Sequence, residues 1–456
     1  MPRISLPAVF CFLIAAAHAD IDVRGTHLSN PALVQEAASG KRVEANAGWW
    51  GFHPEDATDI LQAALDSGVK KLVIPFMGQP WITRPLNVPS NIEILFEPGV
   101  LLLAKRGEFK GGGDSLLSVM SKENVVIRGY GATLRMWKRD YQKPPYEKAE
   151  WRMGIRIMGS KKVTVEGLRI ESSGGDGIYV GAGGNLNWCE DVTVRDCVVH
   201  DNHRQGISVI SARNLLIENC VFSNTGGTPP EAGIDIECDA ETDCFVNCVI
   251  RNCVFESNSG HAILVYLKPM TAKTEDISIR FENCHSRMGS PGMVLDDFQD
   301  MKQTGWAGIS VGAIRDDGPN GLIEFINCTT ENTGKESVRI YDKSADRVKV
   351  RFVNCSFKQP WVSAFREEGI PRVPILLHAR RPHLAQTVGN VEFVNCHVFD
   401  NAYRPAVRFE EDAPTQGMKN VSGDITVHNI TGARAYFGAK TENVTLNILD
   451  GMPKKE

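Results

Sequence analysis

The residues best suited to acid–base chemistry in this chain gather between positions 176 and 261. They are four carboxylic acids and two imidazoles that flank or interrupt apolar segments: Asp176, Glu231, Asp235, Glu237, His203 and His261. When carboxylates crowd one another, the like charges raise the pKa of one and leave its neighbour ionised. A pair of this kind supplies the separate acid and base of a hydrolytic reaction.

A phrase that recurs before four apolar segments indicates which of these residues are neighbours. Gly-Ile, or Ala-Ile in the last copy, begins segments at 177, 206, 233 and 262, at spacings of roughly 29, 27 and 29 residues. Because side chains alternate between the two faces of a strand, inward-pointing isoleucines predict two outward columns. The first column holds Tyr179, Ser208, Asp235 and Leu264, and the second holds Gly181, Ile210, Glu237 and Tyr266. The segment 293–297 can be laid on the same register, which would put Asp296 in the second column.

This register predicts a hydrolase site. Outward residues two apart on one strand are separated by roughly 6.5 to 7 Å, and an inverting glycoside hydrolase needs carboxyl groups about 6.5 to 9.5 Å apart. Asp235 and Glu237 are therefore the expected catalytic pair. Glu231, Asp176 and His203 are further catalytic candidates, and the predicted substrate contacts nearby are Arg204, Gln205, His261, Tyr179 and Tyr266.

The same patch also suits elimination or epimerisation of a uronate. That chemistry needs a cation to neutralise the sugar carboxylate, a base for the C5 proton and a group that protonates the leaving oxygen. The candidates for the first task are Arg204 and Lys268, for the second His203 or His261, and for the third Tyr179 or Tyr266. No cofactor is expected for hydrolysis, whereas a lyase would use Ca²⁺ held by carboxylates.

Each candidate also has a purely structural interpretation. Asp176 precedes a glycine and would stabilise a turn. Asp235 and Glu237 would form an ordinary solvated strand face, although acidic residues are depleted in strands. His203 and Arg204 would pair with nearby acids.

The scaffold that positions these residues is indicated by a second repeat, Asn followed by Cys, with Asp replacing Asn once. Seven copies beside strand-like segments are separated by roughly 23 to 44 residues: 196–197, 219–220, 252–253, 283–284, 327–328, 354–355 and 395–396. Repeats of this length with variable insertions predict stacked coils, and the alternating segments beside them predict strands. We expect stacked asparagines in turns and a file of buried cysteines.

Three further cysteines, Cys238, Cys244 and Cys248, cluster outside this file. A local disulfide, simple buried thiols and, least in keeping with known ligand spacings, a zinc site are the alternatives.

The N-terminal region carries two separate signals. Residues 1–19 combine Arg3, a short apolar run and an Ala-x-Ala site, which predicts a secretory signal peptide and a secreted or periplasmic protein. Residues 56–67 have helical periodicity with an acidic start and a glycine stop. We expect this helix to cap the stack within an N-terminal region of about 45–110, in one β-helix domain spanning 20–456.

A long insertion between two predicted coils contains the aromatic residues Trp137, Tyr141, Tyr146 and Trp151 among charged residues. Insertions in a solenoid fall on one face, often the binding face. Trp137, Tyr141 and Trp151 would stack on sugar rings, or the aromatics would instead pack the loop against the wall.

Composition excludes several other classes. The net charge of -5, without a basic stripe, gives no reason to expect nucleic acid. The apolar run in the signal is too short to span a membrane, and no other apolar stretch approaches the required length.

These features resemble the pectin-lyase-like superfamily, which includes polygalacturonase-type glycoside hydrolases, pectate lyases and alginate epimerases. The resemblance rests on the coil register, the signal peptide and the opening from Asp56-Ala57-Thr58 through Pro98-Gly99-Val100. It implies an all-β, single-stranded, right-handed parallel β-helix. Asp176 matches the Asp of the Asn-Thr-Asp-Gly motif of polygalacturonases, but Arg204-Gln205 stands where their acidic pair belongs, and Gly233-Ile234-Asp235 resembles the epimerase phrase only at Asp235.

The sequence thus predicts an exported enzyme with a polysaccharide substrate, a glycoside hydrolase first and a uronate lyase or C5-epimerase second. A β-helix that binds glycans through its aromatic insertion without catalysis is the third alternative.

Overall fold

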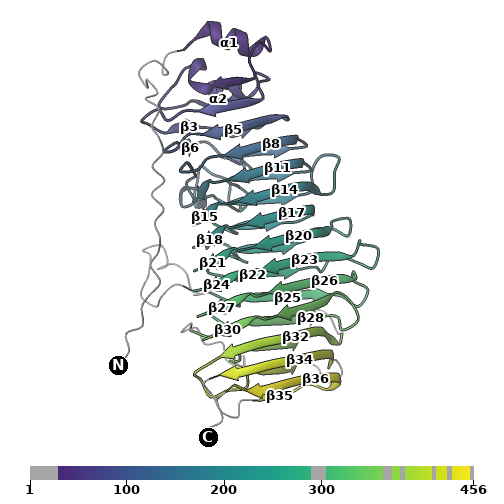
Figure 1. Ribbon diagram of the computed structural model, residues 1–456. Helices are drawn as coiled ribbons and strands as arrows, with labels where there is room; N and C mark the ends of the chain where they lie inside the picture. The colour runs from purple at the N-terminus through teal and green to yellow at the C-terminus, as the bar shows by residue number, and fades with distance from the viewer. Residues whose placement is uncertain are drawn as a thin grey trace, which may run out of the picture.

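Each coil of the chain contributes strands to faces of a long right-handed parallel β-helix (Figure 1). The computed structural model describes residues 29–288, 305–362, 372–380, 386–412, 417–428 and 434–451. The predicted signal peptide lies outside these residues. The all-β expectation is confirmed, since the described residues contain two α-helices and two short 3₁₀ helices beside the strands.

Two faces of the β-helix belong to one continuous sheet. The first face consists of β1 (Glu44–Asn46), β2 (Lys71–Ile74), β5 (Ile92–Phe96), β8 (Glu123–Arg128), β11 (Lys161–Glu166), β14 (Cys189–Arg195), β17 (Ala212–Glu218), β20 (Phe245–Arg251), β23 (Ile277–Glu282), β26 (Gly321–Ile326) and β29 (Lys349–Val353). The second face consists of β3 (Trp81–Thr83), β6 (Leu101–Ala104), β9 (Thr133–Arg135), β12 (Arg169–Glu171), β15 (Val198–His200), β18 (Val221–Ser223), β21 (Val254–Glu256), β24 (His285–Arg287), β27 (Thr329–Glu331) and β30 (Ser356–Lys358). Near the C-terminus, three long strands span both faces: β32 (Val388–Phe399), β34 (Met418–His428) and β36 (Thr441–Asp450).

The third face is a separate parallel sheet of twelve strands. These are β4 (Leu86–Asn87), β7 (Leu117–Met120), β10 (Ile155–Met158), β13 (Ile178–Gly181), β16 (Ile207–Val209), β19 (Ile234–Glu237), β22 (Ile263–Tyr266), β25 (Ile309–Ile314), β28 (Val338–Lys343), β31 (Ile375–Ala379), β33 (Val407–Glu411) and β35 (Ala435–Phe437).

The predicted register of the third face is confirmed. Ile178, Ile207, Ile234 and Ile263 are mutual partners on successive strands, and all four are buried in the core. The strand beside β22 is β25, which pairs Gly312 with Tyr266. Asp296 itself lies outside the described residues.

The Asn-Cys repeat forms the turn between the first and second faces, as predicted. The Asn252 side chain donates a hydrogen bond to Asn219 Oδ1 at 3.4 Å and accepts one from Asn283 Nδ2 at 3.2 Å. Asn252 has a φ of 53°, in the left-handed region that asparagine tolerates better than most residues. The ladder therefore fixes the bend of each coil and the neighbour on either side.

The eleven described cysteines are buried free thiols, including Cys238, Cys244 and Cys248. Of the alternatives, the described structure therefore shows simple buried thiols. In the core below them, the rings of Phe281, Phe325 and Phe352 stack at centroid distances of 4.9 Å.

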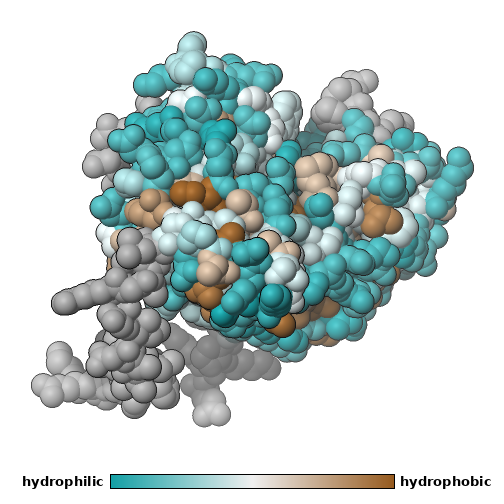
Figure 2. Space-filling model, turned by 90° about the horizontal axis from the view of Figure 1, so that it is seen from above, coloured by the Kyte–Doolittle hydropathy of each residue, from teal (hydrophilic) through white to brown (hydrophobic). Residues whose placement is uncertain are grey.

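Two helices close the N-terminal end. The predicted cap is α2 (Thr58–Leu65), whose Leu61 and Leu65 face the core beside Leu86 of β4. A further helix, α1 (Pro31–Ala38), was not predicted; it packs on the 3₁₀ helix η2 (Ala47–Trp50) at the end of the stack (Figure 1). A second 3₁₀ helix, η3 (Asp140–Gln142), lies in the aromatic insertion. Seen from above, the capped end is mostly hydrophilic, with scattered hydrophobic patches (Figure 2).

The N-terminal region of about 45–110 already contains coils, because β2, β5 and β8 form an in-register parallel ladder. No helix among the described residues is long and apolar enough to cross a membrane.

Candidate active site

Carboxylates from consecutive coils meet on the outer face of the third sheet. Asp235 and Glu237 point outward from β19, and Asp176 lies two residues before β13. Arg204 precedes β16, the strand between β13 and β19. The β-helix register therefore brings together residues separated by up to two coils.

A single guanidinium lies among these acids. Arg204 Nη1 is 3.9 Å from Asp176 Oδ2, and Arg204 Nη2 is 3.9 Å from Glu237 Oε2. Arg204 Nε is 4.0 Å from Glu150 Oε1. Since one positive charge faces several carboxylates in a largely buried place, at least one carboxyl group is expected to retain its proton near neutral pH.

Asp235 is the most tightly held of the acids, with only 1% of its surface exposed. Gln205 Nε2 donates a hydrogen bond to Asp235 Oδ2 at 2.8 Å, and Asp235 Oδ1 has no hydrogen-bond partner. Burial and then the negative charge of Glu237 hold the pKa of Asp235 well above its usual range.

Asp235 and Glu237 influence each other's protonation: the negative charge of Glu237 adds to the raised pKa of Asp235, whereas Asp235 opposes the rise for Glu237. Burial is the largest cause of the raised pKa of Glu237, and Arg204 counteracts it. The two groups therefore form a dyad in which one carboxyl group retains its proton while the other is ionised.

Asp176 is fully buried, and neither carboxylate oxygen has a hydrogen-bond partner within the standard distance. Burial raises its pKa to about 7, against the opposing effects of Arg204 and Ser208. This value lies in the range where a carboxylic acid can still donate its proton at neutral pH.

Two of the predicted catalytic residues point into a neighbouring loop. Glu231 Oε1 accepts a hydrogen bond from the Gly227 N–H at 2.8 Å. His203 Nε2 lies 2.9 Å from Thr228 Oγ1, and its ring packs against Gly227. Burial lowers the pKa of His203 to about 4, so the imidazole is neutral in the loop's interior.

The other predicted contact residues line the face around the acids. Tyr179 pairs in register with Ser208 beside Asp235, and Tyr266 pairs with Glu237. Burial raises the pKa of both tyrosines. His261 is buried with its ring edge-on to Trp306, at a centroid distance of 4.9 Å, and burial lowers its pKa to about 3.

The aromatic insertion does not behave as one binding platform. Tyr141 is fully buried against Tyr146 and Arg152, so its predicted contact with sugar is wrong and packing against the wall is the observed role. The face of the Trp137 ring is covered by the Arg106 guanidinium at 3.8 Å. Trp151, 53% exposed, remains accessible.

Sequence reasoning missed Glu150 and Tyr341 as neighbours of the acid cluster. The charge of Glu150 contributes to the raised pKa of Asp176, and Asp235 contributes to that of Tyr341. The Gly-Ile register would have placed Tyr341 in the column of Glu237 if it had been continued to Val338-Arg339-Ile340. Glu150 carries no such signal, because it lies in an insertion.

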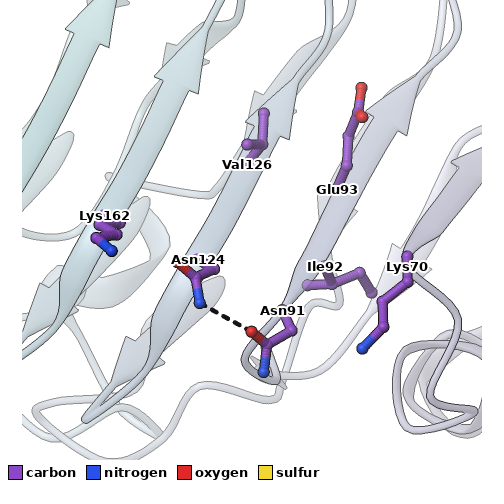
Figure 3. Close-up of a pocket in the computed structure, with 7 residues that line it drawn as sticks. All are labelled: Lys70, Asn91, Ile92, Glu93, Asn124, Val126 and Lys162. Carbon is purple, nitrogen blue, oxygen red and sulfur yellow. Dashed lines mark hydrogen bonds between the residues drawn. The ribbon is translucent and has the colours of Figure 1, made fainter.

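Within the residues that the structure describes, no three His, Cys, Asp or Glu side chains are arranged to hold a metal ion. A hollow of about 500 Å³ on the first face, lined by residues including Glu93 and Lys162, also lacks a carboxylate pair (Figure 3). Glu93 is ion-paired with Arg128 at 3.0 Å. The acid cluster on the third face is therefore the stronger candidate for catalysis.

Comparison with known families agrees with this architecture. A family model described as a right-handed β-helix region matches residues 148–287 and 189–370. The chain thus has the right-handed parallel β-helix fold. A curated relative, an uncharacterised prophage-derived protein YorA of Bacillus subtilis, is 28% identical over 202 residues, which are 41% of this chain and 34% of the relative. The chain thus spans about a third of that relative's length.

Solved structures with this fold have diverse activities. The α-1,3-glucanase catalytic unit of Streptomyces thermodiastaticus matches with a TM-score of 0.61 at 12% identity, over 90% of this chain and 68% of that one. The mannuronan C-5 epimerase AlgE6 A-module of Azotobacter vinelandii matches with 0.58 at 15%, over 90% and 100%. The Streptococcus pneumoniae surface adhesin PfbA matches with 0.55 at 11%, over 89% and 93%. At these identities the matches establish the fold alone.

Proposed function

We propose that this protein is an exported polysaccharide-active enzyme that hydrolyses glycosidic bonds with Asp235, Glu237 and Asp176. The observation that carries the proposal is the buried cluster of these three acids around one arginine. Burying ionisable groups is unfavourable unless they are paired, and strongly shifted pKa values in such clusters are typical of catalytic sites.

The roles follow from the protonation states. Asp176, with its pKa raised to about 7 by burial, is suited to donate a proton to the leaving oxygen. One carboxyl group of the Asp235–Glu237 dyad retains its proton, and the ionised member activates water or stabilises the developing positive charge on the sugar ring. Arg204 keeps the cluster from being uniformly protonated. Glu231 and His203 position the loop beside it.

The contacts of Arg204 and His203 favour hydrolysis over uronate elimination or epimerisation. Elimination needs a cation available to the sugar carboxylate and a base available to the C5 proton. Arg204 already faces Asp176 and Glu237, and His203 is held by Thr228 under a loop. The fold relatives that act on glycans support a polysaccharide as substrate, and the predicted signal peptide supports a secreted or periplasmic location.

The test is turnover of a panel of purified polysaccharides, with reducing ends and unsaturated uronate ends measured in parallel. Hydrolysis releases reducing ends alone, elimination also produces ultraviolet-absorbing ends, and a binding protein produces neither. Asp235→Asn should lower turnover at least about 100-fold, in line with the usual contribution of an acid or base.

A matched control is Glu324→Gln, which also converts a buried strand carboxylate to an amide. Glu324 lies on the first face, between Arg280 and Arg351. The Glu324→Gln variant should leave turnover unchanged. Full activity in Asp235→Asn, or equal losses in both variants, would contradict the site assignment.

A further inference from the structure

A cationic surface lies beyond the acid cluster on the same outer face, towards the C-terminus. Asp235, Leu264, Ser310 and Arg339 are register partners on β19, β22, β25 and β28. Three coil steps of about 4.8 Å place Arg339 roughly 14 Å from Asp235 along the axis. An extended chain lying along this face past Asp235 would therefore pass Arg339.

The arginines on either side of Tyr341 differ in how their charge is compensated. Arg380 is fixed by Asp342, with Nη2 at 2.9 Å and Nε at 3.0 Å from Asp342 Oδ2. Arg339 has no carboxylate partner among the residues that the structure describes, and its buried Nε has no hydrogen-bond partner. Its guanidinium is instead 5.6 Å from the centroid of the Tyr341 ring.

Most strand arginines that the structure describes engage acids of neighbouring coils, as Arg128 engages Glu93 and Arg251 engages Glu218. Arg156, in the same outer column towards the N-terminus, instead donates to the Gly113 carbonyl at 2.9 Å and to Ser118 Oγ at 3.2 Å. Arg408, in the same outer column as Arg339 and further along the axis, is paired with Glu410. Arg339 therefore carries a positive charge that the described fold leaves for another partner.

Tyr341, the neighbour of Arg339, is closely packed. Tyr341 lies against Gly312, where a Cβ would come within 2.4 Å of the ring, and the Arg380 guanidinium covers the ring at 4.1 Å. The Tyr341 ring thus lies close to two guanidinium groups. The charges of Arg339 and Arg380 also lower the pKa of buried His261, behind burial itself, which shows that positive potential extends over this part of the face.

We propose that Arg339, together with Arg380 and Tyr341, forms a subsite for an anionic group of the bound polysaccharide, so that the substrate is an acidic glycan. A guanidinium presents paired N–H donors that match carboxylate, sulfate and phosphate oxygens, which share this recognition chemistry. The inference rests on the proposed function, because the acid cluster defines where the reacting bond lies.

A binding measurement tests this inference independently of catalysis. The full chain carrying Asp235→Asn would be titrated by calorimetry with a uronate oligosaccharide, its carboxyl-reduced form, and sulfated and phosphorylated oligosaccharides. We expect at least one acidic ligand to bind and the matched neutral ligand to bind at least about 10-fold more weakly. Adding Arg339→Gln should weaken binding of the acidic ligand roughly 10- to 100-fold and leave the neutral ligand unaffected, while Arg339→Lys should restore part of the loss.

The matched control is Arg408→Gln, which removes a paired arginine from the same column and should change affinity little. If Asp235→Asn does not fold, Glu237→Gln provides the background. Equal affinity for acidic and neutral ligands, no binding of any acidic ligand, or an unchanged affinity in Arg339→Gln would overturn the inference. Binding that depends on Arg339 without any turnover by the wild-type protein would instead overturn the proposed function and leave the subsite standing.

Discussion

Gln205 anchors Asp235 of the next coil of the β-helix. Its Nε2 donates to Asp235 Oδ2 at 2.8 Å, and its Oε1 accepts the Ala232 N–H at 2.7 Å. Both contacts are buried, so the amide fixes the strand entrance and the carboxylate together. Gln205 was predicted to contact substrate, but its amide is already used on both sides, which makes it a positioning residue.

Replacing Gln205 should separate the effect of its contact with Asp235 from the effect of its contact with Ala232. Gln205→Leu removes a donor that favours the ionised form of Asp235, so the pKa of Asp235 should rise and the acidic limb of kcat/KM should move to higher pH. The unpaired Ala232 N–H should lower the free energy of unfolding by about 1 to 3 kcal/mol. pH–rate profiles and urea unfolding measure the two effects.

Gln205→Glu serves as the comparison, because it retains an acceptor for Ala232 but places a carboxylate against Asp235. Gln205→Glu should shift the acidic limb of kcat/KM at least as far as Gln205→Leu does. It should lower the free energy of unfolding by less. An unmoved limb in both variants would reduce Gln205 to a structural residue.

The pKa of Asp176 predicts how stability changes with pH. Its pKa is about 7 in the folded protein, because of burial, and 3.8 is the ordinary value. A raised carboxyl pKa contributes stability that is complete below the unfolded value and is lost as pH rises through the folded value. The wild type should therefore lose stability relative to Asp176→Asn between about pH 4 and 7, by about 4 kcal/mol at 1.36 kcal/mol per pKa unit.

Urea unfolding of both proteins across pH 4 to 8 measures this difference. Glu324→Gln, titrated in parallel, corrects for the general pH dependence of unfolding. A constant difference between the wild type and Asp176→Asn across the range would mean that Asp176 is ionised throughout.

The hydrogen bonds and backbone conformation of Asn252 predict how much the stacked asparagine turns stabilise the protein. Asn252→Ala removes both side-chain hydrogen bonds and forces alanine to a φ of 53°. The left-handed conformation alone costs a non-glycine residue roughly 1 to 2 kcal/mol. Asn252→Gly keeps the conformation accessible, so it should be the less destabilised variant when both are unfolded in urea. Equal destabilisation of the two variants would show that the lost hydrogen bonds, and not the backbone conformation, dominate.

The repeat in the sequence predicts the β-helix well because every coil repeats the same alternation of buried apolar and outward side chains. The apolar alternation around Ile178, Ile207 and Ile234 admits one register that buries all three side chains, and this register puts Asp235 beside Ser208. The direction of a side chain at the edge of a coil has no such constraint. The side chains of Glu231 and His203 therefore point into the 225–228 loop, where Glu231 contacts Gly227 and His203 contacts Thr228.

Insertions were the least predictable part of the site, and Arg152 shows why. Its guanidinium is buried and donates to backbone carbonyls of Phe109 at 2.8 Å, Lys110 at 3.0 Å and Glu147 at 2.6 Å. Nothing periodic in the sequence indicates these contacts. They hold the aromatic insertion against the wall and bring Glu150 within 4.0 Å of Arg204.

Arg152→Met should therefore act at a distance. Methionine fills much of the buried volume but leaves the carbonyls without donors, at about 1 to 3 kcal/mol for each unsatisfied group. The insertion should loosen and the charge of Glu150 should leave the cluster. Since that charge helps to raise the pKa of Asp176, the limb of the pH–rate profile that depends on Asp176 should move to lower pH.

Glu150→Gln provides the matched test, because it removes the same charge while Arg152 continues to hold the loop. It should reproduce the shift of the pH–rate profile without the loss of stability or the faster proteolysis within 137–151 that are expected for Arg152→Met. If Arg152→Met shifts the profile but Glu150→Gln does not, the insertion acts on the site through packing, and the Glu150 carboxylate has no part in setting the acidity of Asp176.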